Sequence, residues 1–88
     1  MRVGQTRRRD QSEDAIVAAL RKIGVQVWRI SAPGLPDLIT HHRGTWRPLE
    51  IKRPGGSLTP AQRETARTAP FAMVSSVSEA VLVFGVGE

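Results

Sequence analysis

The sequence contains no cysteine, so neither a disulfide bond nor a zinc site built from thiolates is available to the fold. It also lacks any apolar run approaching the roughly 20 residues that span a bilayer. Its opening residues show no hydrophobic stretch of the signal-peptide type. Together these absences predict a soluble, cytoplasmic protein.

Chain length limits the size of the core. The 88 residues suffice for one domain, and a domain of this size buries only about 60% of the surface that its unfolded chain exposes. The core is therefore expected to be thin. A second copy of the chain, a bound metal ion or a nucleic acid remain as sources of additional stability.

Lysine is scarce as well. Only Lys22 and Lys52 occur, so arginine carries most of the positive charge behind the formal net charge of +5. The planar guanidinium group matches phosphate oxygens in pairs, which favours a polyanionic partner such as nucleic acid. The alternative is that the arginines reflect only the base composition of the gene.

The first ten residues are polar and basic and show no apolar periodicity. They contain three consecutive arginines: Arg7, Arg8 and Arg9. A run of like charges is typical of a flexible arm, which either contacts DNA phosphates or is a solvated tail. Residues 1–10 are therefore expected to be a flexible basic arm, and residues 11–88 a single domain.

A helix is expected to begin near residue 11 and to end at Gly24. Asp10 or Ser12 would cap its start, and glycine is the residue that most often follows the end of a helix. The apolar residues of this segment follow the spacing of one buried helical stripe, at Ile16, Ala19, Leu20 and Ile23.

Three strands, a helix, a strand and a last helix are expected to follow. The ranges are 25–30, 37–41 and 46–52 for the three strands, 60–69 for the helix, 71–75 for the next strand and 77–84 for the last helix. Pro48 cannot donate to a sheet ladder, so the third strand should lie at an edge or a bulge, or begin pairing only after this residue. The order α-β-β-β-α-β-α predicts an α/β (α+β) fold with a small mixed β-sheet flanked by helices.

Two carboxylates and a lysine fall on two neighbouring predicted strands. Side chains alternate along a strand, so Glu50 and Lys52 face the same side, and a turn at residues 42–45 brings Asp37 back towards Glu50. Two carboxylates so close repel each other unless a cation lies between them, and oxygen ligands select hard cations such as Mg²⁺ or Mn²⁺. Lys52 would orient or deprotonate a water, or stabilise charge on a phosphate.

Three segments together resemble the PD-(D/E)XK nuclease superfamily, and more narrowly the stand-alone form of the VRR-NUC family. They are GLPDLI at 34–39, LEIK at 49–52 and LTPAQ at 58–62. Taken alone, Glu50 and Lys52 would fit an ordinary surface ion pair, whereas the combination of segments is far more specific. The resemblance covers roughly residues 12–85 and implies that superfamily's helix–three-strand–helix–strand core.

The resemblance implies a divalent-metal-dependent DNA endonuclease that hydrolyses phosphodiester bonds. Asp37 and Glu50 would bind the metal together with the main-chain carbonyl of Ile51, and Lys52 would be the catalytic lysine. Stand-alone members of this family are homodimers that cut branched DNA such as four-way (Holliday) junctions. The alternatives are a non-catalytic DNA-binding module and a nuclease subunit that needs a partner protein.

Two further residues match family positions. Glu13 matches an acidic residue of the first helix that belongs to the metal site, and Gln62 matches a catalytic-site glutamine of the second helix. Each has a structural alternative, because Glu13 with Asp10, or Gln62 with Thr59, would also form a capping box.

The remaining polar and aromatic residues near these segments are less specific. Trp28 and Trp46 are expected in the core, with stacking on bases as the alternative. His41 and His42 are expected in the turn and not at a metal, since neighbours on a strand face opposite ways. The arginines close to the proposed site in sequence are candidate DNA contacts: Arg29, Arg43, Arg47, Arg53 and Arg63.

Overall fold

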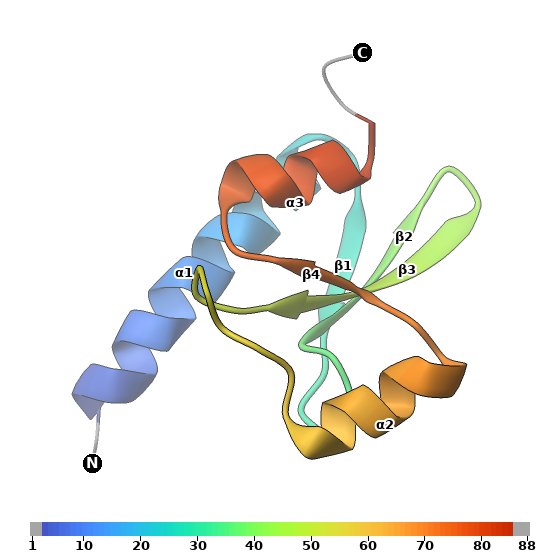
Figure 1. The fold of residues 1–88 in the computed structure, drawn as a ribbon. Coiled ribbons are helices and arrows are strands. Elements are labelled where there is room, and N and C mark those ends of the chain that lie inside the picture. The colour runs from blue at the N-terminus through green and yellow to red at the C-terminus, as the bar shows by residue number, and fades with distance from the viewer. Residues whose placement is uncertain (1–2, 86–88) are drawn as a thin grey trace.

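A computed structural model describes the backbone of residues 3–85 and the side-chain surroundings of residues 12–85. These residues form three helices and four strands (Figure 1). In chain order they are α1 (Val3–Lys22), β1 (Gln26–Arg29), β2 (Leu38–His42), β3 (Thr45–Ile51), α2 (Pro60–Thr68), β4 (Ala72–Val74) and α3 (Val77–Val83). The predicted order of elements is confirmed.

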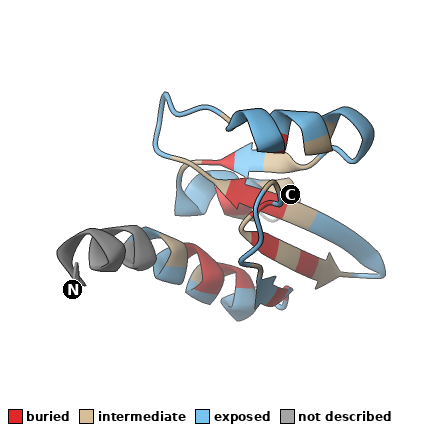
Figure 2. Ribbon diagram, turned by 90° about the horizontal axis from the view of Figure 1, so that it is seen from below, coloured by how far each residue is buried: buried red, intermediate tan, exposed pale blue. Residues whose placement is uncertain are grey.

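The four strands make one mixed sheet in the order β1-β2-β3-β4. The first two pairings are antiparallel and the pairing of β3 with β4 is parallel. Helices α1 and α3 lie on one side of this sheet and α2 on the other, as Figures 1 and 2 show from two directions. The predicted class, a small mixed sheet flanked by helices, is confirmed.

Pro48 does not lie on an edge strand. It sits within β3, opposite Ile39 of β2, while pairing with β4 begins only at Leu49. Lys52 donates its main-chain N–H to Val74 of β4, so the nitrogens of even-numbered β3 residues face that side. The nitrogen of Pro48, which has no hydrogen to donate, therefore faces the side where β4 has not yet begun. The expectation that pairing begins only after Pro48 holds for β4 and not for β2.

Helix α1 begins earlier than predicted, at Val3 instead of near residue 11. Arginine and glutamine are good helix formers, so the basic segment continues the helix without an apolar stripe of its own. Asp10 and Ser12 consequently lie inside the helix and do not cap it. The side chains of Arg7, Arg8 and Arg9 lie outside the described residues, so the expectation that they contact phosphate remains a prediction.

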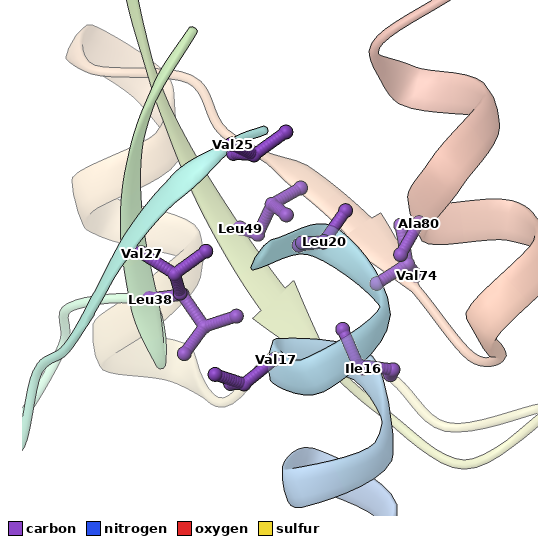
Figure 3. Packing of buried hydrophobic residues seen from close by; sticks show 9 residues of the cluster. All are labelled: Ile16, Val17, Leu20, Val25, Val27, Leu38, Leu49, Val74 and Ala80. Atoms are coloured by element: carbon purple, nitrogen blue, oxygen red, sulfur yellow. The ribbon is translucent and has the colours of Figure 1, made fainter. Parts of the chain in front are cut away.

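The core fills the space between the sheet and the pair α1 and α3. Ile16 and Leu20 of the predicted stripe are buried there, Ala19 and Ile23 are half-buried, and Val17 joins them. Nine residues make up the buried cluster (Figure 3): Ile16, Val17, Leu20, Val25, Val27, Leu38, Leu49, Val74 and Ala80. Within the part of the chain that the structure describes, no helix has the length and apolar character needed to cross a membrane.

The prediction that both tryptophans belong to the core is wrong. Trp28 is 45% exposed and Trp46 is 60% exposed. Val27 is buried under α1, so its neighbour Trp28 faces the opposite side of the sheet. Figure 2 shows that α2 and the far end of the β2–β3 hairpin are largely exposed, whereas the buried residues gather in the strand centres and in α1.

The histidines lie in β2 and not in the turn, which corrects a second prediction. The turn is shorter than expected and consists of Arg43 and Gly44, with φ values of 52° and 81°. Two successive positive φ angles are what a two-residue type I′ hairpin requires. His41 and His42 face opposite sides, as the alternation of a strand demands.

Candidate metal and phosphate site

The hairpin register places Asp37 opposite Glu50. The last pair of the β2–β3 ladder joins Leu38 to Leu49, and one step further along the same register Asp37 meets Glu50. Both leucines are buried in the core. Because side chains alternate along each strand, the two carboxylates point to the opposite face, the same face as the tryptophans.

The Asp37 carboxylate is fixed to the backbone of β3. Its Oδ2 atom accepts a hydrogen bond from the Ile51 main-chain N–H at 2.9 Å. This bond continues the β2–β3 ladder by one rung, with a side chain in place of a carbonyl. It holds the carboxylate beside the peptide that joins Glu50 to Ile51. That position suits a ligand shared with Glu50, although the role of the Ile51 carbonyl as a metal ligand remains a prediction.

Glu50 is the most unusual residue of the site. It is only 2% exposed, and its Oε2 atom lies 3.2 Å from Nζ of Lys52. Its Oε1 atom is buried and has no hydrogen-bond partner among the described residues. Leaving a buried polar atom unsatisfied costs about 1–3 kcal/mol, and more when the group is charged. The alternative of an ordinary surface pair is therefore wrong for Glu50.

Lys52 connects this buried carboxylate to solvent. Its side chain is 20% exposed, and it lies two residues beyond Glu50 on the same face of the strand. The ammonium group pairs with the Glu50 carboxylate, and its remaining N–H donors are available to a ligand that arrives from solvent. Lys52 is thus the member of the pair that an incoming phosphate would meet.

The donor set fits a magnesium-like cation better than a metal held entirely by side chains. The described residues contain no group of three or more histidine, cysteine or acidic side chains able to hold a metal ion. Mg²⁺ is usually bound by one or two carboxylates, with waters and substrate phosphates completing its shell. Asp37 and Glu50 match that arrangement, and the unsatisfied Glu50 Oε1 atom is an oxygen that a cation would satisfy.

Glu13 is engaged on the other side of the sheet. Its carboxylate lies 3.4 Å from Arg29, whose guanidinium also binds Asp14 at 2.5 Å. These contacts join α1 to β1. The alternative of a capping box with Asp10 is wrong, because the helix runs through that residue. A metal-site role for Glu13 and a DNA-binding role for Arg29 remain predictions.

Gln62 forms the capping box at the start of α2, which confirms the structural alternative. Its Oε1 atom accepts from the main-chain N–H of Thr59 at 3.0 Å, and its own N–H donates to the Thr59 hydroxyl at 3.1 Å. Its Nε2 atom donates to the Leu35 carbonyl at 3.5 Å. Gln62 thereby ties α2 to the loop that leads into Asp37, and a direct catalytic role remains a prediction.

That loop is packed closely against α2 at one point. Gly34 has a φ of +78°, and a Cβ atom there would lie 3.5 Å from Ala61 and 3.4 Å from Thr65. Glycine is therefore suited both to the backbone conformation and to the close approach. Together with Gln62, this contact fixes where the chain enters β2 and so where Asp37 lies.

The remaining arginines of the predicted set are spread over the surface. Arg43 lies in the hairpin turn and Arg53 directly after Lys52, and both are exposed. Arg63 is exposed on α2 and donates to the Leu58 carbonyl at 2.9 Å. Arg47 lies over the ring of Phe84 at 5.9 Å from its centroid. Arg53 is thus the arginine nearest in sequence to the site.

The exposed tryptophans were predicted to lie in the core, although a signal against this was available for Trp28. Val25 and Val27 are the buried residues of their segment, and the period of a strand then places Trp28 on the other face.

Comparisons with protein-family models, curated proteins and solved structures gave no match to this chain. The nuclease resemblance therefore rests on the residues themselves.

Proposed function

We propose that the chain is a divalent-metal-dependent DNA endonuclease with a PD-(D/E)XK core of the stand-alone VRR-NUC type. The observation that carries this proposal is the buried Glu50 carboxylate, which has one oxygen on Lys52 and the other without a partner among the described residues. Asp37 lies opposite it on the same sheet face. Mg²⁺ or Mn²⁺ is the proposed cofactor.

Burying the Glu50 carboxylate lowers the stability of the fold unless the carboxylate binds a ligand. Removing a carboxylate from water costs several kcal/mol, and a single ion pair repays this only when the remaining lone pairs are also satisfied. Here they are not. A domain of 88 residues has little stability to spare. A cation bound between Asp37 and Glu50 would supply the missing interaction.

The site has the groups that phosphodiester hydrolysis requires. In that reaction a water molecule gives up a proton as its oxygen bonds to phosphorus, the bond to one ester oxygen breaks, and that oxygen takes up a proton. When bound, the divalent cation polarises the phosphoryl group and neutralises charge on the leaving oxygen. Asp37 and Glu50 hold it in place, and the Lys52 ammonium stabilises the phosphate charge or orients the attacking water.

DNA is proposed as the substrate because of the charge of the chain. The net charge is +5, and residues 38–49 of the hairpin contain arginines and histidines but no acidic residue. Such a surface attracts the phosphate backbone of duplex or branched DNA. A negatively charged substrate would also bring oxygen ligands to the cation.

A cleavage assay tests this function. Plasmid, single-stranded, flap and four-way-junction DNA are each incubated with the protein in Mg²⁺, in Mn²⁺ and in EDTA. We expect strand breaks with either metal and none in EDTA. Binding without cleavage under every metal would instead identify a non-catalytic DNA-binding module, and cleavage only after addition of a helicase or other partner would identify a nuclease subunit.

A homodimer is part of the proposal, because cutting both strands requires two incisions and each chain supplies one site. We expect sedimentation at micromolar concentration to give twice the chain mass of 9.6 kDa. A stable monomer with full activity on duplex DNA would remove this part and leave the chemistry of the site intact.

A further inference from the structure

Three rings form an exposed aromatic platform on the face of the sheet opposite α1 and α3. Trp28 of β1 and Trp46 of β3 are stacked, with ring centroids 5.6 Å apart and an interplanar angle of 27°. His41 of β2 lies against Trp46 at 4.7 Å and is held by Gln26, whose Oε1 atom is 2.8 Å from its Nδ1. The platform consists of Trp28, His41 and Trp46.

The platform shares a sheet face with the proposed active site. His41 and Asp37 have the same parity on β2 and its extension, and Trp46, Glu50 and Lys52 have the same parity along β3. Glu50 lies four positions beyond Trp46 along the strand, or about 13 Å away at the usual rise per residue. A nucleic-acid strand that places a phosphate at Lys52 would therefore reach the platform within a few nucleotides.

These two indoles are the largest apolar side chains that the domain leaves in water. The core cluster contains nine residues, and neither tryptophan is among them. Large exposed aromatic surface on a small domain indicates a binding site more often than chance exposure. Residues 38–49 of the hairpin, which include His41 and Trp46, also bear Arg43 and Arg47 and no acidic residue, so the occupant should be anionic as well as aromatic.

We propose that the aromatic platform stacks unpaired nucleobases of the strand that the site cuts. The inference rests on the proposed nuclease function for its place in catalysis and deepens it by naming a substrate class. That class is DNA with unpaired bases a few nucleotides from the cleaved phosphate, as in a single strand, a flap or the opened centre of a junction. Bases stack on aromatic side chains regardless of sequence.

A second copy of the chain is the competing occupant. A copy seated on the platform would lie on the face that carries Asp37, Glu50 and Lys52 and would hinder the approach of a DNA strand to them. Stacked bases leave the same face open along the strand. The geometry therefore favours the nucleic acid here and leaves the proposed dimer contact to another surface.

Binding to the platform can be followed by the intrinsic fluorescence of its tryptophans. Trp28 and Trp46 are the only two tryptophans, and the sequence has no tyrosine. Fluorescence excited at indole wavelengths therefore comes from the platform alone. We titrate the protein in EDTA, where no metal-dependent cleavage occurs, with oligo-deoxythymidine, with an abasic strand of equal length, and with a blunt duplex.

We expect oligo-deoxythymidine to quench the fluorescence and to bind about tenfold or more tightly than the abasic strand, because stacking adds to an equal phosphate charge. The duplex should quench less. Trp46→Leu should lose this preference for bases, and Trp46→Phe should keep much of it. Leu82→Ala, which changes another exposed apolar residue on α3, is the matched control and should behave like the wild type.

Equal quenching and affinity with the abasic strand would overturn the platform proposal. A second copy of the chain would be the occupant if the fluorescence changed on dilution and the Trp46→Leu variant became monomeric. This result would also overturn the platform proposal. Circular dichroism confirms that each variant is folded. Base-dependent binding without cleavage in any metal would overturn the nuclease function and not the platform, whereas cleavage without base-dependent binding would do the reverse.

Discussion

Glu50→Gln is expected to lower the rate of metal-dependent DNA cleavage on the order of 10³-fold. The amide has nearly the same shape as the carboxylate but no negative charge to hold a cation. Lewis-acid stabilisation by a metal is worth several kcal/mol, and each factor of ten in rate corresponds to about 1.4 kcal/mol. Single-turnover cleavage of a branched substrate in Mg²⁺ measures the loss.

A second readout separates lost metal binding from lost folding. Mn²⁺ should raise the thermal unfolding temperature of the wild type, because a ligand that binds only the folded state stabilises it. The shift should disappear in Glu50→Gln. Glu64→Gln makes the same chemical change at an exposed carboxylate paired with Arg67 and should keep both cleavage and shift. A folded Glu50→Gln protein that cleaves at near wild-type rate would refute the proposed metal site.

Lys52→Ala is expected to destabilise the metal-free protein by about 3 kcal/mol. Removing one partner of a buried ion pair leaves the other charge uncompensated, and such losses run to about 3–5 kcal/mol. The lower figure applies because Lys52 is partly exposed. Urea unfolding in EDTA measures the change, which is a large fraction of the roughly 5–15 kcal/mol that stabilises an ordinary domain.

The pair can be separated by a double-mutant cycle. Adding Glu50→Gln to Lys52→Ala removes the uncompensated charge and should recover most of the lost stability. Lys22→Ala, at the exposed end of α1, is the matched control and should change stability by no more than about 0.5 kcal/mol. If the effects of the two site substitutions simply added, Glu50 and Lys52 would not be coupled and the account of the buried charge would be wrong.

The placement of Asp37 opposite Glu50 was predictable from the sequence. A short turn after His42 fixes the register of a hairpin, and the period of two then decides which side chains share a face. The capping box of Thr59 and Gln62 was predictable for a similar reason, since it depends on four consecutive residues. Local rules sufficed wherever the contact lies within one hairpin or one helix turn.

Other features depend on contacts between distant segments and were not predictable. The burial of Glu50 depends on which segments cover that end of the sheet. The partner of Glu13 is Arg29, which reaches it from a different element. Trp28 and Trp46 were assigned to the core from residue type, which says that an indole is often buried but not which face of a strand receives the covering helices.

Pro48 has a consequence for how the molecule avoids uncontrolled association. Before the point where pairing with β4 begins, the side of β3 that faces away from β2 is an open edge. Such edges can recruit further strands into fibrous aggregates. Trp46 and Pro48 are the residues whose nitrogens face that edge, and proline has no hydrogen to offer. An incoming strand would find only one donor along this stretch, so Pro48 disfavours polymerisation through this part of β3.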